Sequence, residues 1–483
     1  MKPWGMLKKA LILLFVFSLS ACEAAELEPQ VAGQFYPEDA VTLGAMVDEL
    51  IARAENKPVN GRLLAIISPH AGYQFSGGVS AHGYKRLKGS GIKTVIIIGA
   101  AHNHSYEGAS VWTNGAFKTP LGAVKIDGKL ARRLIKKKAK VDFIPEVFSG
   151  EHSIEVQLPF LQRTLGDFKI VPIMIGNPTR ESIEHLVSEL TGMLYESENV
   201  LLVASTDLSH YHDYDTAVEM DGRLTGALSR LSLREVQELL AAGQAEMCGA
   251  FPVMVTLAAA RGLGANESAI FKYANSGDAT GDKGRVVGYL SAGFYRSPLT
   301  QAEKSELLGI ARQTIIRYVK SRDVEEEPAL KNGRLRVEGA VFVTITRGGM
   351  LRGCIGHIES VTSLYKSVIR NAYAASSMDP RFPPMTPEEL KDMHIEISVL
   401  SPLRPIKKTS SIQVGRDGLY IVKGNRAGIL LPQVAKDNGW DRKTFLKQVS
   451  LKAGLPEDAW KDAALYTFTA EVFGEGGAVP PPQ

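Results

Sequence analysis

The sequence has little cysteine and almost no excess of either charge. Its three cysteines among 483 residues are Cys22, Cys248 and Cys354. Three cysteines at such wide spacing exclude a disulfide scaffold, and they offer no CxxC pair for a metal knuckle or a redox couple. Outside the first 21 residues, which hold three lysines and no acid, 53 basic residues face 52 acidic ones. A sequence-independent nucleic-acid binder usually has a basic surplus, so we expect no nucleic-acid partner.

Several familiar catalytic signatures are also missing. The chain contains no GxGxxG fingerprint, no HExxH and no GxSxG elbow, and residues 277–283 resemble a phosphate loop but have the wrong spacing. What is present is ordinary globular composition, with 45% hydrophobic and 22% charged residues. At 483 residues the chain is long enough for two or three domains.

The N-terminus has the features of an export signal. Lys8 and Lys9 precede an apolar run over residues 10–17, which is too short to span a bilayer, and small residues then lead to Cys22. The segment 19–22 resembles a lipoprotein lipobox, so we expect residues 1–22 to be a signal peptide and Cys22 to carry lipid. The alternative is a plain signal peptide cut nearby, for instance before Ala25. Either way we expect an exported protein. Glu23 after the cysteine favours retention in an outer membrane, facing the periplasm.

Four short apolar runs predict a parallel sheet. They cover residues 63–67, 95–98, 170–175 and 200–204, and helical patterns separate them. Runs that are apolar on both faces are typical of buried strands in an α/β fold. We therefore predict an α/β domain over residues 27–296, with a mostly parallel sheet flanked by helices.

The pattern changes after residues 297–298. A helical pattern follows, and then strands with alternating apolar residues, such as 341–346 and 394–399. Mixed helices and alternating strands predict an α+β domain over residues 299–475. The Gly/Pro-rich end, residues 476–483, is predicted to be a flexible tail.

Metal-competent side chains follow the predicted strands. His70, His102, and Asp207 with His210 come just after strand ends, where ligands bind in open α/β sheets. Cys248 lies in a loop-like stretch and completes a His/His/Cys set that suits iron, zinc or copper rather than magnesium or calcium. Any one of these residues is more simply a surface histidine, a core cysteine or a helix cap. Their joint position at strand ends favours a site.

The remaining polar residues suggest roles around that site. An imidazole can accept or release a proton near neutral pH, so His210 is the candidate acid or base, with Asp207 orienting it or a bound water. His152 and His104 either support a metal ligand from behind or have no role. Eight of the ten histidines precede position 213, which favours a site in the first domain only.

At these residues the sequence resembles the Memo family. The resemblance covers about residues 27–296 and rests on six stretches: AGQFYP (32–37), PHAGY (69–73), GAAH (99–102), EHSIE (151–155), STDLSH (205–210) and CG (248–249). The family is similar in fold to LigB-type class III extradiol dioxygenases, which are non-haem iron enzymes. The resemblance implies His70, His102 and Cys248 as metal ligands, with Asp207 and His210 lining the site. The dioxygenases have a carboxylate where Cys248 stands, which weakens the case for ring opening.

The second half, about residues 299–475, resembles the AMMECR-type domain. Its marker is LRGCIG (351–356), supported by DPRFPP (379–384) and ISVLSP (397–402). Cys354 is either a nucleophile on an exposed turn or a thiol that packs inward between two glycines. Chains that join these two domains resemble the AmmeMemoRadiSam set, which implies a radical SAM protein as partner.

Three functional hypotheses follow. The first is a redox enzyme with a non-haem iron site and a small-molecule substrate, anchored to a membrane by lipid. The second is a protein that keeps a dioxygenase-like fold but only binds a ligand or partner. The third is a zinc hydrolase that uses the same ligands and a metal-bound water.

Overall fold

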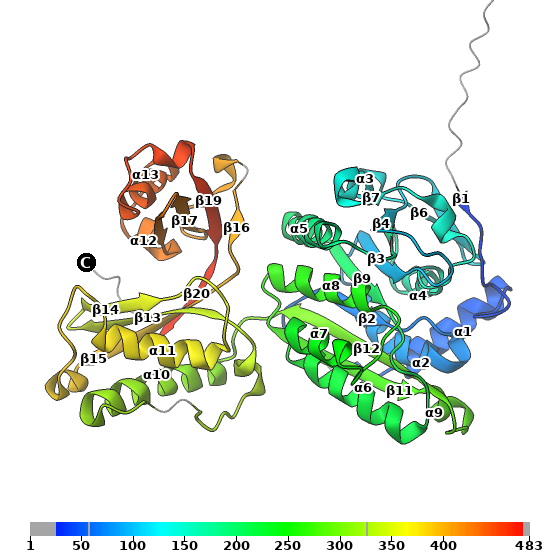
Figure 1. Cartoon of the computed structure of the whole chain (residues 1–483), viewed down its shortest axis with the longest axis horizontal. Coiled ribbons are helices and arrows are strands. Elements are labelled where there is room, and N and C mark those ends of the chain that lie inside the picture. Colours follow the sequence, from blue (N-terminus) through cyan, green and yellow to red (C-terminus); the bar gives the residue numbers. More distant parts are fainter. Residues whose placement is uncertain (1–25, 57, 325–326, 407, 477–483) are drawn as a thin grey trace, which may run out of the picture.

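The chain folds into two bodies that lie side by side (Figure 1). The computed structural model describes residues 26–476 except 57, 325, 326 and 407. We call residues 26–296 the N-terminal part and residues 299–476 the C-terminal part. The predicted signal peptide, Cys22 and residues 477–483 of the predicted tail lie outside the described residues. No helix in the described ranges is long and apolar enough to cross a membrane.

A nine-stranded sheet forms the centre of the N-terminal part. Its four middle strands are parallel and lie in the order β2, β9, β3, β8. Their bounds are β2 Arg62–Ser68, β9 Val200–Ser205, β3 Thr94–Ala100 and β8 Lys169–Ile175. Each contains one of the four predicted apolar runs, and their side chains are almost all buried. The prediction of an α/β fold with a parallel sheet is therefore confirmed.

Shorter and antiparallel strands extend this sheet, and a small three-stranded sheet lies beside it. The further strands of the large sheet are β4 Ala109–Val111, β7 Val141–Asp142, β10 His210–His212, β11 Glu267–Asn275 and β12 Val286–Arg296. The small sheet contains β1 Glu26–Leu27, β5 Ala116–Thr119 and β6 Gly122–Lys125.

Helices cover both faces of the large sheet (Figure 1). Asp39 caps the first of them, because its carboxylate accepts the backbone N–H of Thr42 at 2.9 Å. The helices are α1 Ala40–Arg53, α2 Tyr73–Tyr84, α3 Gly128–Leu134, α4 Leu158–Thr164, α5 Arg180–Glu196, α6 Tyr214–Ser229, α7 Leu233–Ala241, α8 Ala250–Gly262 and α9 Ser276–Thr280.

The C-terminal part is built on a four-stranded antiparallel sheet. In order across the sheet the strands are β14 Met350–Gly356, β13 Ala340–Arg347, β15 Met393–Leu400 and β20 Ala470–Gly474. Val341, Val343 and Ile345 alternate along β13 and are fully buried in one core with residues of α10 Gln301–Ser321 and α11 Leu364–Ser377. This arrangement is the α+β fold that the alternating pattern predicted.

A smaller lobe lies on the other side of that sheet (Figure 1). It consists of a second antiparallel sheet with two helices and has its own small core. Its elements are β16 Arg404–Pro405, β17 Gly418–Lys423, β18 Arg426–Leu430, α12 Pro432–Asp437, α13 Arg442–Lys452 and β19 Ala464–Phe468.

Candidate metal centre

The carboxyl ends of three adjacent parallel strands bring the predicted residues together. His70 follows β2, His102 follows β3, and Asp207 follows β9, which lies between them. Parallel strands end at the same edge of a sheet, so residues far apart in the sequence become neighbours there. His70, His102 and Asp207 therefore lie at one edge of the sheet.

Three imidazoles converge at this edge. His70, His102 and His152, which we call the histidine cluster, offer ligand atoms that all lie within 4.8 Å of one another. The His102 and His152 rings stack with centroids 4.8 Å apart, and the His70 ring meets both nearly edge-on. Three imidazoles at this spacing can hold a metal ion.

The hydrogen bonds of Ser205 fix the tautomer of His70. The Ser205 hydroxyl donates to the carbonyl of Ser153 at 2.5 Å, so its oxygen must accept from Nδ1–H of His70 at 2.9 Å. Nδ1 therefore holds the proton, and Nε2 keeps its lone pair for an ion. Gln157 donates to the same oxygen at 2.9 Å and is itself held by the hydroxyl of Tyr84.

Glu151 orients His102 in a similar way. Its carboxylate accepts Nδ1–H of His102 at 3.0 Å and the backbone N–H of the same residue at 2.7 Å. Burial opposes the ionisation of Glu151, but these bonds and the positive charge on His102 lower its pKa to about 2. Carboxylate–histidine pairs of this kind are common behind metal ligands.

The imidazoles differ in their protonation. Hydrogen bonds to Cys248 and then to Glu151 raise the pKa of His102 to about 9. Burial, followed by the neighbouring His70, lowers the pKa of His152 to about 4. His152 is therefore neutral at pH 7, the form in which histidine binds metals.

Cys248 lies against the histidine cluster, beside β9. Its Sγ is 3.1 Å from Nε2 of His70 and accepts the backbone N–H of Asp207 at 3.2 Å. Two ligands about 2.0–2.3 Å from one ion are separated by roughly 3–4 Å, so this spacing suits a shared metal. The next residue must be small, since a Cβ on Gly249 would lie 2.5 Å from the carbonyl oxygen of Ser205.

Asp207 and His210 do not play equivalent roles in this geometry. The buried Asp207 carboxylate accepts the backbone N–H of His70 at 2.8 Å, so it positions that residue and not His210. His210 lies on β10, and its backbone N–H points to Glu246 at 3.4 Å. Among the described residues, no hydrogen bond links the His210 side chain to the histidine cluster.

The sequence did not predict the roles that His152 and Glu151 have in this site. From the sequence, His152 is either a residue that supports a metal ligand or one without a role, and Glu151 has no predicted role. Both lie in an irregular segment between the 3-10 helices η3 (Pro145–Phe148) and η4 (Glu155–Gln157), not at the end of a strand. The signal in the sequence is the EHSIE stretch itself. His104, the other residue predicted to support a ligand or to have no role, has a buried Nδ1 without a partner in the described part of the chain.

Cys354 lies within strand β14 and not on an exposed turn. Its thiol is 3.3 Å from the hydroxyl of Thr344 on β13, and its backbone N–H donates to Asp379 at 2.8 Å. Burial raises the pKa of Cys354, so the thiol stays protonated. The geometry favours the inward-packed interpretation of this residue.

The fold and the site together define an α/β protein with a metal-competent histidine cluster at the carboxyl edge of its sheet. The chain belongs to the Memo family: it matches the Memo-like protein family over residues 27–293, and it also matches the AMMECR1 family over residues 308–473. The two families follow each other in one chain.

Two relatives that are MEMO1 family proteins agree with this assignment. A MEMO1 family protein of Methanopyrus kandleri is 37% identical over 283 residues, which are 56% of this chain and 99% of the relative. A MEMO1 family protein of Sulfolobus acidocaldarius is 36% identical over 279 residues, which are 55% of this chain and 98% of the relative. The crystal structure of an uncharacterized protein from Pyrococcus horikoshii is 39% identical, with a TM-score of 0.35, and covers 35% of this chain and 90% of that one.

Proposed function

We propose that this protein binds one transition-metal ion between the histidine cluster and Cys248. The observation that carries the proposal is the convergence of three imidazoles, two of which have Nδ1 engaged by Ser205 or Glu151. Such outer partners leave Nε2 directed at a common point. The proposal keeps His70, His102 and Cys248 as predicted ligands and adds His152.

The donor set selects the class of metal. Imidazole nitrogen and thiolate sulfur suit iron, zinc and copper, whereas magnesium and calcium require oxygen ligands. We propose iron, because the Memo family resembles non-haem iron dioxygenases in fold. Zinc and copper are the competing outcomes of a metal analysis.

We further propose that the site belongs to a redox enzyme with a small-molecule substrate. A bound iron would supply electron transfer and an open position for the substrate. The chain supplies the rest: Asp207 holds the His70 backbone in place, and Glu151 keeps the proton of His102 on Nδ1. His210, three residues beyond Asp207, is the proposed acid or base.

A ligand scan tests the metal site. We expect H70A, H102A and H152A, purified without oxygen from the native compartment, to lose most of the bound metal. We expect the same of C248A. The matched control is H82A, because His82 lies on α2 and its Nδ1 contacts the carbonyl of Gly78 in the same helix. Full metal in folded H70A and C248A would contradict the site, whereas full metal in H152A alone would return His152 to a supporting role.

The wild-type protein, purified in the same way, tests which reaction the site supports. Iron together with oxygen consumption supports the redox enzyme. Zinc together with hydrolysis of a model ester supports the hydrolase instead. Metal without either reaction supports a protein that only binds its ligand.

We also propose export and a partner. The lipobox-like segment ending at Cys22 supports a lipoprotein on the periplasmic side, with the outer membrane favoured. The tandem of Memo-like and AMMECR1 matches supports a radical SAM protein as partner, by resemblance to the AmmeMemoRadiSam set. Direct binding between the two purified proteins tests this partner, and an absence of binding would contradict it.

A further inference from the structure

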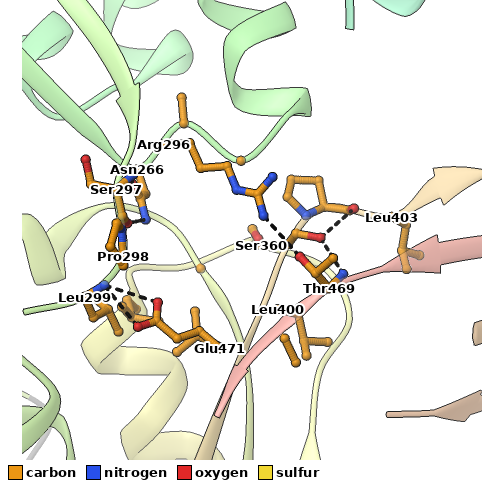
Figure 2. Close-up of a pocket in the computed structure, with 18 of the residues that line it drawn as sticks. Asn266, Arg296, Ser297, Pro298, Leu299, Ser360, Leu400, Leu403, Thr469 and Glu471 are labelled. Atoms are coloured by element: carbon orange, nitrogen blue, oxygen red, sulfur yellow. Dashed lines mark hydrogen bonds between the residues drawn. The ribbon is translucent and has the colours of Figure 1, made fainter. Parts of the chain in front are cut away.

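A cavity of about 1150 Å³ lies between the N-terminal and C-terminal parts (Figure 2). On one side its wall contains Arg62 at the start of β2 and Arg296 at the end of β12, and on the other side Leu400 and Thr469. His70 of the histidine cluster follows the opposite end of β2. A strand rises about 3.3 Å per residue, so roughly 20 Å separates the two places.

Two arginines face each other in the wall of this cavity. Arg62 and Arg296 are register partners in the antiparallel pair β2–β12. Like charges directly opposite in such a pair destabilise a sheet. Within the described residues, neither guanidinium has a carboxylate within 4.0 Å. An anion between the two guanidinium groups would relieve their repulsion.

A third arginine approaches from the small lobe. Arg404 on β16 lies near enough to Arg296 to lower its pKa, although burial is the larger cause of that shift. The Arg404 guanidinium lies 3.3 Å from the centre of the Tyr195 ring, at the end of α5. Arg62 and Arg296 therefore lie in the wall of the cavity, and Arg404 adds a third positive charge near them without lining the cavity itself.

Ordinary structural contacts account for two of these arginines but not for Arg296. Arg62 donates to the carbonyls of Leu194 and Ser197, where a helix end favours a cation. Arg404 covers an aromatic ring. Among the described residues, the one hydrogen-bond acceptor of the Arg296 guanidinium is the hydroxyl of Thr469, at 3.3 Å, as Figure 2 shows. Arg296 is exposed to solvent and forms no ion pair with another described residue, so its guanidinium is open to a ligand that enters the cavity.

The acids of the wall leave this charge in place. Glu338 pairs with Arg261 at 2.8 Å, and Glu471 pairs with Lys304 at 2.9 Å. Glu359 is exposed to solvent. Glu198 acts on Arg62 and Arg296 electrostatically without forming an ion pair with either. With Glu198 as the one acid that acts on both Arg62 and Arg296, this end of the cavity keeps a positive charge.

We propose that this cavity binds a small organic phosphate. Its phosphoryl group takes the position beside Arg296 and Arg62, because guanidinium groups match phosphate oxygens in pairs, and the nearby charge of Arg404 strengthens the attraction. The volume exceeds that of a phosphate alone, and Leu400 and Leu403 offer an apolar wall for the organic part. Interfaces between domains are frequent places for such ligands.

The test measures the binding of inorganic pyrophosphate, used as a probe, to the full chain by titration calorimetry. We expect the wild type to bind and R296Q to bind about tenfold or more weakly, since one charge-assisted contact is lost. The matched control is R234Q: that arginine is on α7, its side chain is 82% exposed, and it contacts Glu238. We expect R234Q to bind like the wild type and acetate to displace pyrophosphate poorly.

Three results would overturn the proposal. The wild type would not bind pyrophosphate, folded R296Q would bind it as well as the wild type, or acetate would displace pyrophosphate as effectively as phosphate does. If R296Q does not melt cooperatively, R404Q replaces it, because Arg404 lies outside the β2–β12 pair. Metal content is unaffected in all these variants, so failure here leaves the metal proposal standing.

Discussion

Glu151 contacts His102 twice. One carboxylate oxygen accepts the backbone N–H at 2.7 Å, and the other accepts Nδ1–H at 3.0 Å. The carboxylate thus fixes both the position of the residue and the orientation of its ring. The Glu151 side chain is only 1% exposed, so water does not replace it easily.

We therefore expect E151Q to bind metal about 10–100-fold more weakly than the wild type. The amide keeps the shape of the side chain but loses the charge that holds the proton of His102 on Nδ1. Competition with a chromogenic chelator measures the affinity. Glu151 acts through His102, so it is a positioning residue.

The control for this change is E246Q. Glu246 also contacts a histidine, with 3.0 Å between its Oε2 and Nε2 of His212, but it lies outside the histidine cluster. The E246Q variant should therefore bind metal with the same affinity as the wild type. Equal affinity in E151Q and E246Q would show that the Glu151 carboxylate has no influence on the site.

The contrast between His70 and His152 explains how far the sequence predicts this centre. His70 and His102 follow buried apolar runs, and the edge of a parallel sheet brings such positions together. His152 follows no strand, and its place depends on how an irregular segment packs. The facing pair of Arg62 and Arg296 depends on strand register, which a single sequence does not reveal.

The sequence leaves two interpretations of Cys354 open, because the stretch LRGCIG fits either a turn or a strand.

A second prediction concerns the pH dependence of the C-terminal part. The hydrogen bond from Arg381 is the main reason that the pKa of Asp379 falls to about 2, below its usual value. A lowered pKa in the folded state stabilises the fold above about pH 4, and this contribution is lost as the pH falls towards about 2. Because Arg381 is 46% exposed, we expect only about 1 kcal/mol.

Thermal melting between pH 2 and 5 measures this effect. We expect D379N to have a flatter pH dependence than the wild type for the C-terminal transition. The control is D462N, because Asp462 pairs with Lys423 at 2.8 Å but its side chain is 67% exposed. An unchanged slope in D379N would mean that the ion pair with Arg381 contributes nothing to stability.

A third prediction concerns the N-terminus. If Cys22 carries lipid, C22A should move from the membrane fraction to the soluble fraction of its host, because one change removes the acceptor thiol. Fractionation and mass spectrometry of the mature N-terminus measure this. A C354A variant is the control for loss of a cysteine as such. A wild type that is soluble and begins at another residue would exclude the lipid anchor.

The last prediction concerns the division between the two parts. Every residue of the proposed metal site lies before residue 250, and the core around it is formed almost entirely by residues 31–294. Residues 23–296 alone should therefore fold and bind metal about as well as the full chain. C354A in the full chain should keep its metal, because Cys354 contacts Thr344 and Asp379 in the other part.

Metal stoichiometry and cooperative melting of the separate N-terminal part measure this. A fragment that melts cooperatively but binds no metal would mean that the C-terminal part supplies a ligand or holds the histidine cluster in place. The fragment also lacks Arg404 and Thr469, so it should bind pyrophosphate more weakly than the full chain. Retained metal together with weakened pyrophosphate binding would separate the two proposed sites physically: one complete within the N-terminal part, the other formed only where both parts meet.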